Sequence, residues 1–204
     1  MKQPGITSTS VLGNPVLRRE DATLVRGQGE YVGNQIIEGA FHCHFVRSTV
    51  AHGQIISIET SEAESMPGVQ AIYTADNLGL EDREGAMDFY ASEMTRPYLA
   101  RDRVRFVGEP IAVVVAETAY QAADAVENIW ADIEPLDPVV TLQDSLAAET
   151  ILFPDMDHNV CWENEIEDPI DFSEYEVVIS QDVINSRVAP VSIETRVAAA
   201  TWED

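Results

Sequence analysis

Hydrophobic and polar residues alternate along much of the chain from residue 40 onward, which predicts β-strands. In AFHCHFVRS (40–48), Phe41, Cys43 and Phe45 fall on one side, while His42 and His44 fall on the other. A two-residue period of this kind is typical of a strand. QIISIET (54–60), VQAIYT (69–74), RVRF (103–106) and WADIEPLDPVV (130–140) are also predicted to be strands.

Two short segments carry helix signals. Ser61 stands three residues before Glu64, the spacing of a capping box, and Pro67 and Gly68 follow as helix terminators. Thr118 and Gln121 repeat the spacing, and the segment AYQAADAVENIW (119–130) then places apolar residues at helical intervals. We therefore expect a short helix after residue 60 and a longer one after residue 118.

The segment 111–116 is apolar without interruption, which predicts a strand buried on both faces. A tight turn at Gly108, Glu109 and Pro110 precedes it. This succession of strand, turn, buried strand, helix and strand predicts an α+β domain that ends near residue 140.

The flanking regions differ from this central part. Glycine and proline punctuate residues 1–35 without a sustained period, which predicts an extended arm with turns. Residues 141–173 are interpreted as an acidic linker, and 175–183 and 187–203 as two further strands. Because an unpaired strand edge is normally covered, we expect both the arm and the last strand to need partners.

The composition is that of an acidic globular protein. The 204 residues (22.5 kDa) include 36 Asp and Glu against 12 Lys and Arg, a net charge of −24 with a pI near 4.2. With 45% hydrophobic residues, the chain can bury a core. The charge excludes nucleic acid and anionic membranes as favourable partners.

The positive charges are unevenly distributed. Lys2 is the only lysine, and no Lys or Arg occurs from residue 106 to residue 186, a stretch with 19 acidic residues. Such a stretch is either a solvated face or a docking surface.

Cysteine usage and hydropathy predict a cytoplasmic protein. Cys43 and Cys161 lie far apart and match no disulfide or zinc motif. We expect neither a secretory signal nor a membrane span, since the longest apolar run is six residues.

The sequence contains no complete catalytic, cofactor-binding or metal site. His42 and His44 share a strand face but lack further ligands nearby, except that His52 could fold back toward them. Asp155, Asp157 and Asn159 match only the opening of a calcium loop. The GQG at 27–29 lacks the third glycine of a dinucleotide fingerprint.

Glu109 is the one carboxylate in an apolar neighbourhood, where its pKa could rise. No acid or base partner is adjacent in sequence. We therefore interpret Glu109 as a residue that closes a turn rather than as a catalytic group.

Several longer segments resemble a known family. They are GNPVLRREDATLVRGQGEYVGN (13–34), FVRSTVAHGQIISIETSEAESMPGVQAIYTADNL (45–78) and RFVGEPIAVVVAETAYQAADAVENIWADIEPLDPVV (105–140). Together they resemble the amino-terminal part of the molybdenum-binding large subunit of the xanthine dehydrogenase and aldehyde oxidase family, which includes carbon monoxide dehydrogenases.

The resemblance implies a domain organisation. Residues 20–140 would form an α/β hammerhead domain that overlaps the arm (1–35). Residues 174–204 would be the incomplete start of a molybdopterin-binding domain. In such enzymes a molybdopterin cofactor hydroxylates an aldehyde or heterocycle, and electrons pass to iron–sulfur clusters and FAD on other domains or subunits.

The resemblance also implies what the chain lacks. The cofactor-binding segments and the catalytic glutamate lie in the later part of a family large subunit, so this chain alone is expected to be inactive and to bind no cofactor. It would be a fragment, a truncated product or one half of a split subunit.

Two functions follow as hypotheses. In the first, the chain is a structural portion of a molybdenum hydroxylase large subunit. Its partners are then the remainder of that subunit, the iron–sulfur and FAD subunits, and possibly a second copy of itself. In the second, it is a stand-alone hammerhead-fold binding or scaffold protein with an acidic docking face.

The candidate interface residues are Arg18, Arg19, Glu20, Asp21, Gly108, Glu109, Pro110, Glu194 and Arg196.

Overall fold

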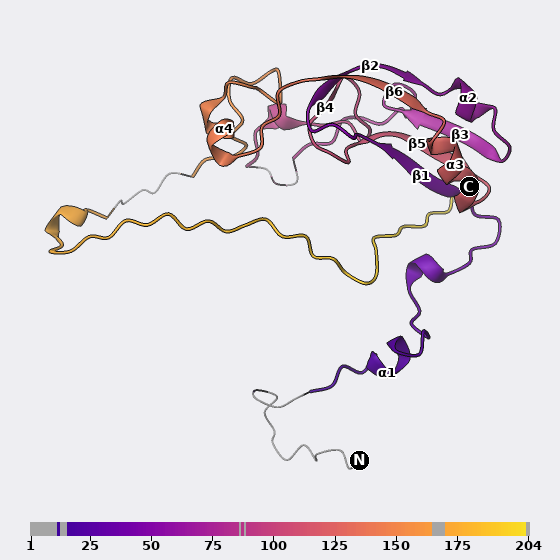
Figure 1. The fold of residues 1–204 in the computed structure, drawn as a ribbon, viewed down its shortest axis with the longest axis horizontal. Coiled ribbons are helices and arrows are strands. Elements are labelled where there is room, and N and C mark those ends of the chain that lie inside the picture. Colours follow the sequence, from indigo (N-terminus) through magenta and orange to yellow (C-terminus); the bar gives the residue numbers. More distant parts are fainter. Residues whose placement is uncertain (1–11, 13–15, 86, 88, 165–169, 203–204) are drawn as a thin grey trace, which may run out of the picture. The chain divides into compact units, whose positions relative to one another are not determined.

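The computed structural model describes residues 12, 16–85, 87, 89–164 and 170–202 (Figure 1). Parts of the predicted arm (1–11 and 13–15) and of the acidic linker (165–169) lie outside the described residues. The chain forms two units, residues 39–177 and residues 1–38 together with 178–204, and each is described by itself.

The first unit contains a three-stranded sheet with β5 at its centre. β5 (Pro110–Ala116) pairs antiparallel with β1 (His42–Arg47) on one side and β3 (Val69–Thr74) on the other. The apolar run of β5 is buried at five of its seven positions. β1 and β3 cover both edges of this strand and most of its side chains are buried, so apolar residues are favoured along it.

A second antiparallel sheet has the order β4-β2-β6. β2 (Gly53–Glu59) lies between β4 (Arg103–Val104) and β6 (Trp130–Pro135). Gly53 is required where β2 approaches β6, because an added Cβ would lie 2.9 Å from the backbone oxygen of Glu134. The absence of a side chain thus permits the close approach of the two strands.

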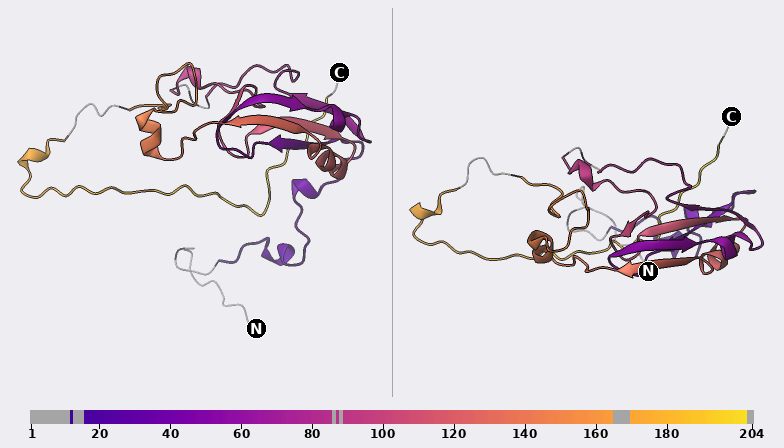
Figure 2. Two further views of the ribbon diagram at one scale, coloured as in Figure 1. Left: turned by 45° about the horizontal axis from the view of Figure 1, so that its top comes forward. Right: turned by 90° about the horizontal axis from the view of Figure 1, so that it is seen from above.

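Helix α3 (Ala119–Val126) begins as the sequence predicts. The Thr118 hydroxyl accepts a hydrogen bond from the backbone N–H of Gln121 at 3.2 Å and donates one to the Gln121 side-chain oxygen at 2.8 Å. α3 lies at one end of the strands in both views of Figure 2.

The capping box predicted at Ser61 is wrong. Helix α2 (Ser61–Glu64) has Thr60 as its N-cap, without a side-chain capping bond, and Ser61 is its first helical residue. The Thr60 hydroxyl instead donates to the Glu64 carboxylate at 2.6 Å. Glu64 is therefore four residues from the N-cap, where a capping box needs three.

One hydrophobic core joins the sheets and helices of this unit. Alternate residues of β5 pack with α2, α3, β1, β3 and β4. The fully buried members are Ala63, Val104, Ala112, Val114, Ala116, Ala122 and Ala125. Strands and helices mixed around one core confirm the predicted α+β class.

Part of the segment interpreted as a linker is folded in this unit. Helix α4 (Leu142–Ala147) has a complete capping box, in which Thr141 and Asp144 bond each other's backbone N–H groups at 3.1 and 3.0 Å. A loop follows, and the Asn159 side chain closes it by bonds to Thr150 O and Leu152 N at 2.8 and 2.9 Å. A 3-10 helix spans Phe172–Glu174, and another spans Ser92–Met94.

The second unit is extended. It contains α1 (Asp21–Leu24) and a 3-10 helix at Val32–Asn34, as expected for an arm with turns. The described residues 178–202 form no strand, so the strands predicted at 175–183 and 187–203 are not formed in this structure. Their apolar, β-branched residues suit a strand, but a strand is stable only beside a hydrogen-bonded neighbour.

Candidate functional site

The turn at Gly108 and Glu109 is fixed by hydrogen bonds to the last residue of β1 and to the residue after it. The Gly108 N–H donates to Ser48 O at 2.8 Å, and the Arg47 guanidinium donates to Gly108 O at 2.8 Å. Gly108 has φ +88°, a conformation that favours glycine. The Glu109 side chain is only 5% exposed and accepts the backbone N–H of Arg105. Glu109 thus closes the turn, and its buried carboxylate is not presented to a ligand.

Pro110 continues from this turn into β5. Its carbonyl accepts the N–H of Ala100 at 2.7 Å, which fastens the preceding loop to the sheet. Phe106 and Val107, just before the turn, are exposed. The turn therefore presents apolar side chains at its surface while its own backbone groups are bonded internally.

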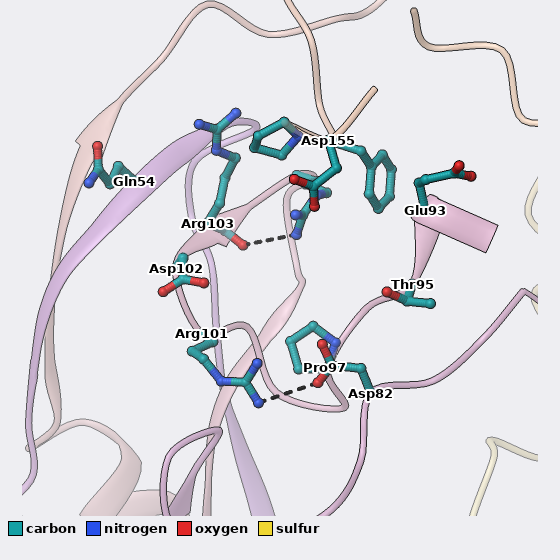
Figure 3. Close-up of a pocket in the computed structure, with 12 residues that line it drawn as sticks. Gln54, Asp82, Glu93, Thr95, Pro97, Arg101, Asp102, Arg103 and Asp155 are labelled. Atoms are coloured by element: carbon teal, nitrogen blue, oxygen red, sulfur yellow. Dashed lines mark hydrogen bonds and ion pairs between the residues drawn. The ribbon is translucent and has the colours of Figure 1, made fainter. Parts of the chain in front are cut away.

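A polar pocket lies beside β4 and the edge of β2, with a volume of about 300 Å³ (Figure 3). Arginines at alternate positions 101, 103 and 105 enter it from the same stretch of chain. Arg101 pairs with Asp82 at 3.3 Å, and Arg103 donates to the carbonyl of Ile151 at 3.1 Å. The other charged lining residues are Glu93, Asp102 and Asp155.

Arg105 is partly buried. Its Nε donates to Leu152 O at 2.9 Å, and its guanidinium lies 4.6 Å from the centroid of the Phe153 ring. Desolvation lowers the pKa of Arg105, and the negative charge of Glu109 opposes this shift. Arg103 and Arg105 therefore hold the loop of residues 150–162, here called the strap, against β4.

The strap has a second attachment near its carboxyl end. The N–H of Ala91 donates to Cys161 O at 2.9 Å, and the Phe89 and Trp162 rings lie 5.2 Å apart. Two of the three pocket arginines, Arg103 and Arg105, thus bond the strap. No histidine or cysteine is among the residues that line this pocket.

The histidine candidates do not converge. His42 and His44 are exposed on β1, whereas His52 is buried with Nδ1 2.7 Å from Asp137 O. Within the described ranges, no three His, Cys, Asp or Glu side chains gather as a group that could hold a metal ion. Asn159, of the calcium-like motif, bonds the strap backbone instead.

The arm candidates lie around α1. Arg18 pairs with Asp21 at 2.8 Å, and both side chains are about half exposed. Glu20 is the N-cap of α1 without a side-chain bond, and Arg19 is exposed. These four charges are free to meet a partner but form no pocket in the described arm.

Glu194 connects the two parts of the second unit. Its carboxylate accepts the N–H of Val32 at 3.1 Å, and the methyl of Val197 lies close to Gly33. Arg196 is exposed nearby in sequence. The structure thus brings Glu194 to the arm, while the turn at Gly108 belongs to the other unit.

The strap-holding arginines were missed by the sequence reasoning. Their alternation at 101, 103 and 105 is a usable signal, because every second residue of a strand points to the same side. Their acceptors, the carbonyls of Ile151 and Leu152, lie more than 40 positions later and carry no sequence signal.

Comparison with known proteins decides the family. Residues 26–137 match the model of the aldehyde oxidase and xanthine dehydrogenase a/b hammerhead domain. The chain belongs to the aldehyde oxidase and xanthine dehydrogenase family. The two antiparallel sheets with α2 and α3 are thus its hammerhead domain, and the predicted family and fold class are confirmed.

Two relatives of this chain are named as the large subunit or large chain of an enzyme. It is 36% identical over 208 residues to the nicotine 6-hydroxylase large subunit of Paenarthrobacter nicotinovorans, covering 98% of this chain and 25% of the relative. The carbon monoxide dehydrogenase large chain of Hydrogenophaga pseudoflava is 30% identical, and the alignment covers 91% of this chain and 25% of the relative. The chain therefore spans about a quarter of the length of these curated relatives.

A solved structure shows the same fold. The aldehyde oxidoreductase from Desulfovibrio gigas matches with a TM-score of 0.61 and 27% identity, over 71% of this chain and 17% of that chain. Among the helices that the structure describes, none combines the length and apolar character needed to cross a membrane.

Proposed function

We propose that the chain is the amino-terminal portion of the large subunit of a molybdenum hydroxylase and acts there as a structural, non-catalytic part. It braces the molybdopterin-binding part of the subunit and helps to shape the substrate entrance. Its partners are the remainder of the large subunit and, beyond it, iron–sulfur and FAD subunits. We place this assembly in the cytoplasm, which suits two free, exposed cysteines.

The observation that carries this proposal is the apolar character of residues 178–202. Large apolar side chains recur through this extended segment, and Ile184, Val191 and Trp202 are 88%, 92% and 89% exposed. Exposed apolar residues in such numbers mark a surface that another chain or domain covers. The alignment of 98% of this chain with a large subunit supports the same conclusion.

The hammerhead domain carries a further half-open apolar surface. Phe45, Val113 and Tyr73 stand side by side across β1, β5 and β3. Val113 is buried but lies outside the main core, and Phe45 and Tyr73 stay more than one-third exposed. A partner that covered the rings of Phe45 and Tyr73 would gain about 25 cal/mol of stabilisation per Å² of apolar surface that it removes from water. This row is a second place where the remainder of the subunit can pack.

The pocket beside β4 does not fit a molybdopterin site. The arginines beside β4 already bond strap carbonyls or a carboxylate, and four acidic side chains share their pocket. A cofactor phosphate would meet repulsion there. We therefore assign no cofactor-binding or catalytic residue to this chain, and the purified chain is expected to turn over neither aldehydes nor purines.

Co-expression tests this proposal. A tagged copy of the chain is produced with the remaining large-subunit sequence, and co-purification and molybdenum content are measured. The expected result is a stable complex that retains molybdenum. Val191→Asp, which places a charge in the apolar segment, should reduce recovery of the complex at least tenfold, whereas the matched control Asn185→Asp should not.

The opposite outcome would favour the scaffold hypothesis. If the chain purifies as a folded species but captures neither the large-subunit remainder nor molybdenum, the proposed role loses its support. A free-standing hammerhead protein that docks through its acidic face would then be the better account.

A further inference from the structure

A second cavity of about 650 Å³ lies between the loop of residues 83–96 and the strap. Its volume is within the range of small-molecule sites. The walls combine aromatic and thioether groups with two arginines and one carboxylate. The lining side chains used below are Arg83, Glu84, Tyr90, Met94, Arg96 and Phe153.

Arg83 and Arg96 are held directly opposite each other. Each donates its backbone N–H to the carbonyl of the other, at 2.7 and 3.0 Å, in an isolated antiparallel bridge. Side chains at such paired positions project to the same side, about 5 Å apart at Cβ. Both arginines line the cavity, and because like charges repel each other, an anion that contacts both guanidinium groups would be stabilising.

No carboxylate of the described residues pairs with either arginine within 4.0 Å. Their guanidinium groups instead lie 6.0 Å from the Tyr98 ring centroid and 5.8 Å from that of Phe106. This is unexpected in a chain with three times as many acidic as basic residues. The donor groups of both arginines are thus available to a ligand.

The other lining residues determine which kind of anion the cavity favours. Tyr90 and Phe153 provide ring faces, and Met94 adds a polarizable apolar surface, so the cavity accommodates a planar apolar body. Glu84 at the same cavity disfavours a dianion such as phosphate by repulsion but tolerates a single negative charge bound by two arginines.

We propose that this cavity binds a small aromatic monocarboxylate, with Arg83 and Arg96 receiving the carboxylate and Tyr90 and Phe153 contacting the ring. The site lies within the unit of residues 39–177, and it goes beyond the structural role proposed above because it needs no other part of the large subunit. Since Phe153 belongs to the strap and also contacts Arg105, a ligand here adds a contact to the strap.

Benzoate titrated into the full chain, followed by amide NMR or calorimetry, tests the proposal. Benzyl alcohol lacks the charge and acetate lacks the ring, so both should bind at least tenfold more weakly than benzoate. Arg83→Gln should weaken benzoate binding about tenfold, the loss of one charge-assisted contact. Arg83 is exposed, so this variant should remain folded, and Tyr90→Ala should weaken benzoate but not acetate.

Arg18→Gln is the matched control, because Arg18 is also an exposed arginine but lies in the arm and is not among the residues that line the cavity. It should leave benzoate affinity unchanged. Equal affinity for benzoate and acetate, an unchanged affinity in Arg83→Gln, or equal losses in both arginine variants would each overturn the proposal. Failure of the chain to join a large subunit would not affect it, so the two proposals fail independently.

Discussion

Replacing Arg105 by methionine should release the strap from β4. The substitution keeps a long apolar side chain but removes the hydrogen bond to Leu152 O and the cation–π contact with Phe153. A hydrogen bond from a charged group contributes about 1.5–3 kcal/mol, and a cation–π contact about 0.5–2 kcal/mol. Relief of the desolvation that lowers the pKa of Arg105 offsets part of this loss. We expect the substitution to destabilise the closed position of the strap, relative to the open one, by about 2 kcal/mol in total.

A cost of about 2 kcal/mol corresponds to an increase of about 30-fold in the population of the open strap. Hydrogen–deuterium exchange measures it at Ala91, whose N–H bonds Cys161 O on the strap. Arg101→Met is the matched control, because Arg101 pairs with Asp82 and Asp76 rather than with the strap, and exposed ion pairs of this kind contribute at most about 1 kcal/mol each. If both variants exchange equally at Ala91, Arg105 does not hold the strap.

Three further predictions concern the fold. Val114→Ala should lower the free energy of unfolding by about 2–3 kcal/mol, because it leaves a cavity at the centre of β5. Urea denaturation measures this change. The control Val107→Ala, at an exposed position, should change the free energy of unfolding by less than about 0.5 kcal/mol. Gly53→Ala should lower the free energy of unfolding by about 1–3 kcal/mol, because the added Cβ would press on the backbone of β6. An unchanged urea midpoint would show that β2 and β6 can move apart at no cost. The hydrogen bonds from Thr141 lower the pKa of Asp144. Their contribution to the stability of α4 is therefore complete above the ordinary carboxyl pKa of about 3.9. It is lost progressively as the pH falls through the lowered pKa of Asp144 in the folded chain. In a carboxyl NMR titration Asp144 should have a lower midpoint than in an unfolded peptide, and Thr141→Val, which removes the hydroxyl but keeps the backbone N–H donor, should reduce that difference without abolishing it.

The strands and the longer helix could be predicted because their signals are local. The period of β1, the uninterrupted apolar run of β5 and the Thr118 cap each lie within a few residues of the elements they specify. The short helix α2 shows the limit of such signals. Thr60 takes the N-cap position one residue before the predicted one, since neighbouring hydroxyl residues can compete for it.

Features that depend on distant contacts could not be predicted. Helix α4 has its own capping box at Thr141, but the acidic surroundings led to its interpretation as linker. The position of the strap depends on bonds from Arg103 and Arg105 to residues that follow about 47 positions later. For residues 187–203 the apolar pattern predicts a strand, but formation of a strand requires a neighbour that periodicity cannot supply.

The most direct test of the proposed role is hydrogen–deuterium exchange across residues 178–202, in the isolated chain and in its complex with the remainder of the large subunit. We predict that these amides exchange rapidly in the isolated chain, where the described residues form no strand, and at least about 100-fold more slowly in the complex, where they pair. Equally rapid exchange in both samples would contradict the claim that this segment is completed by the rest of a large subunit.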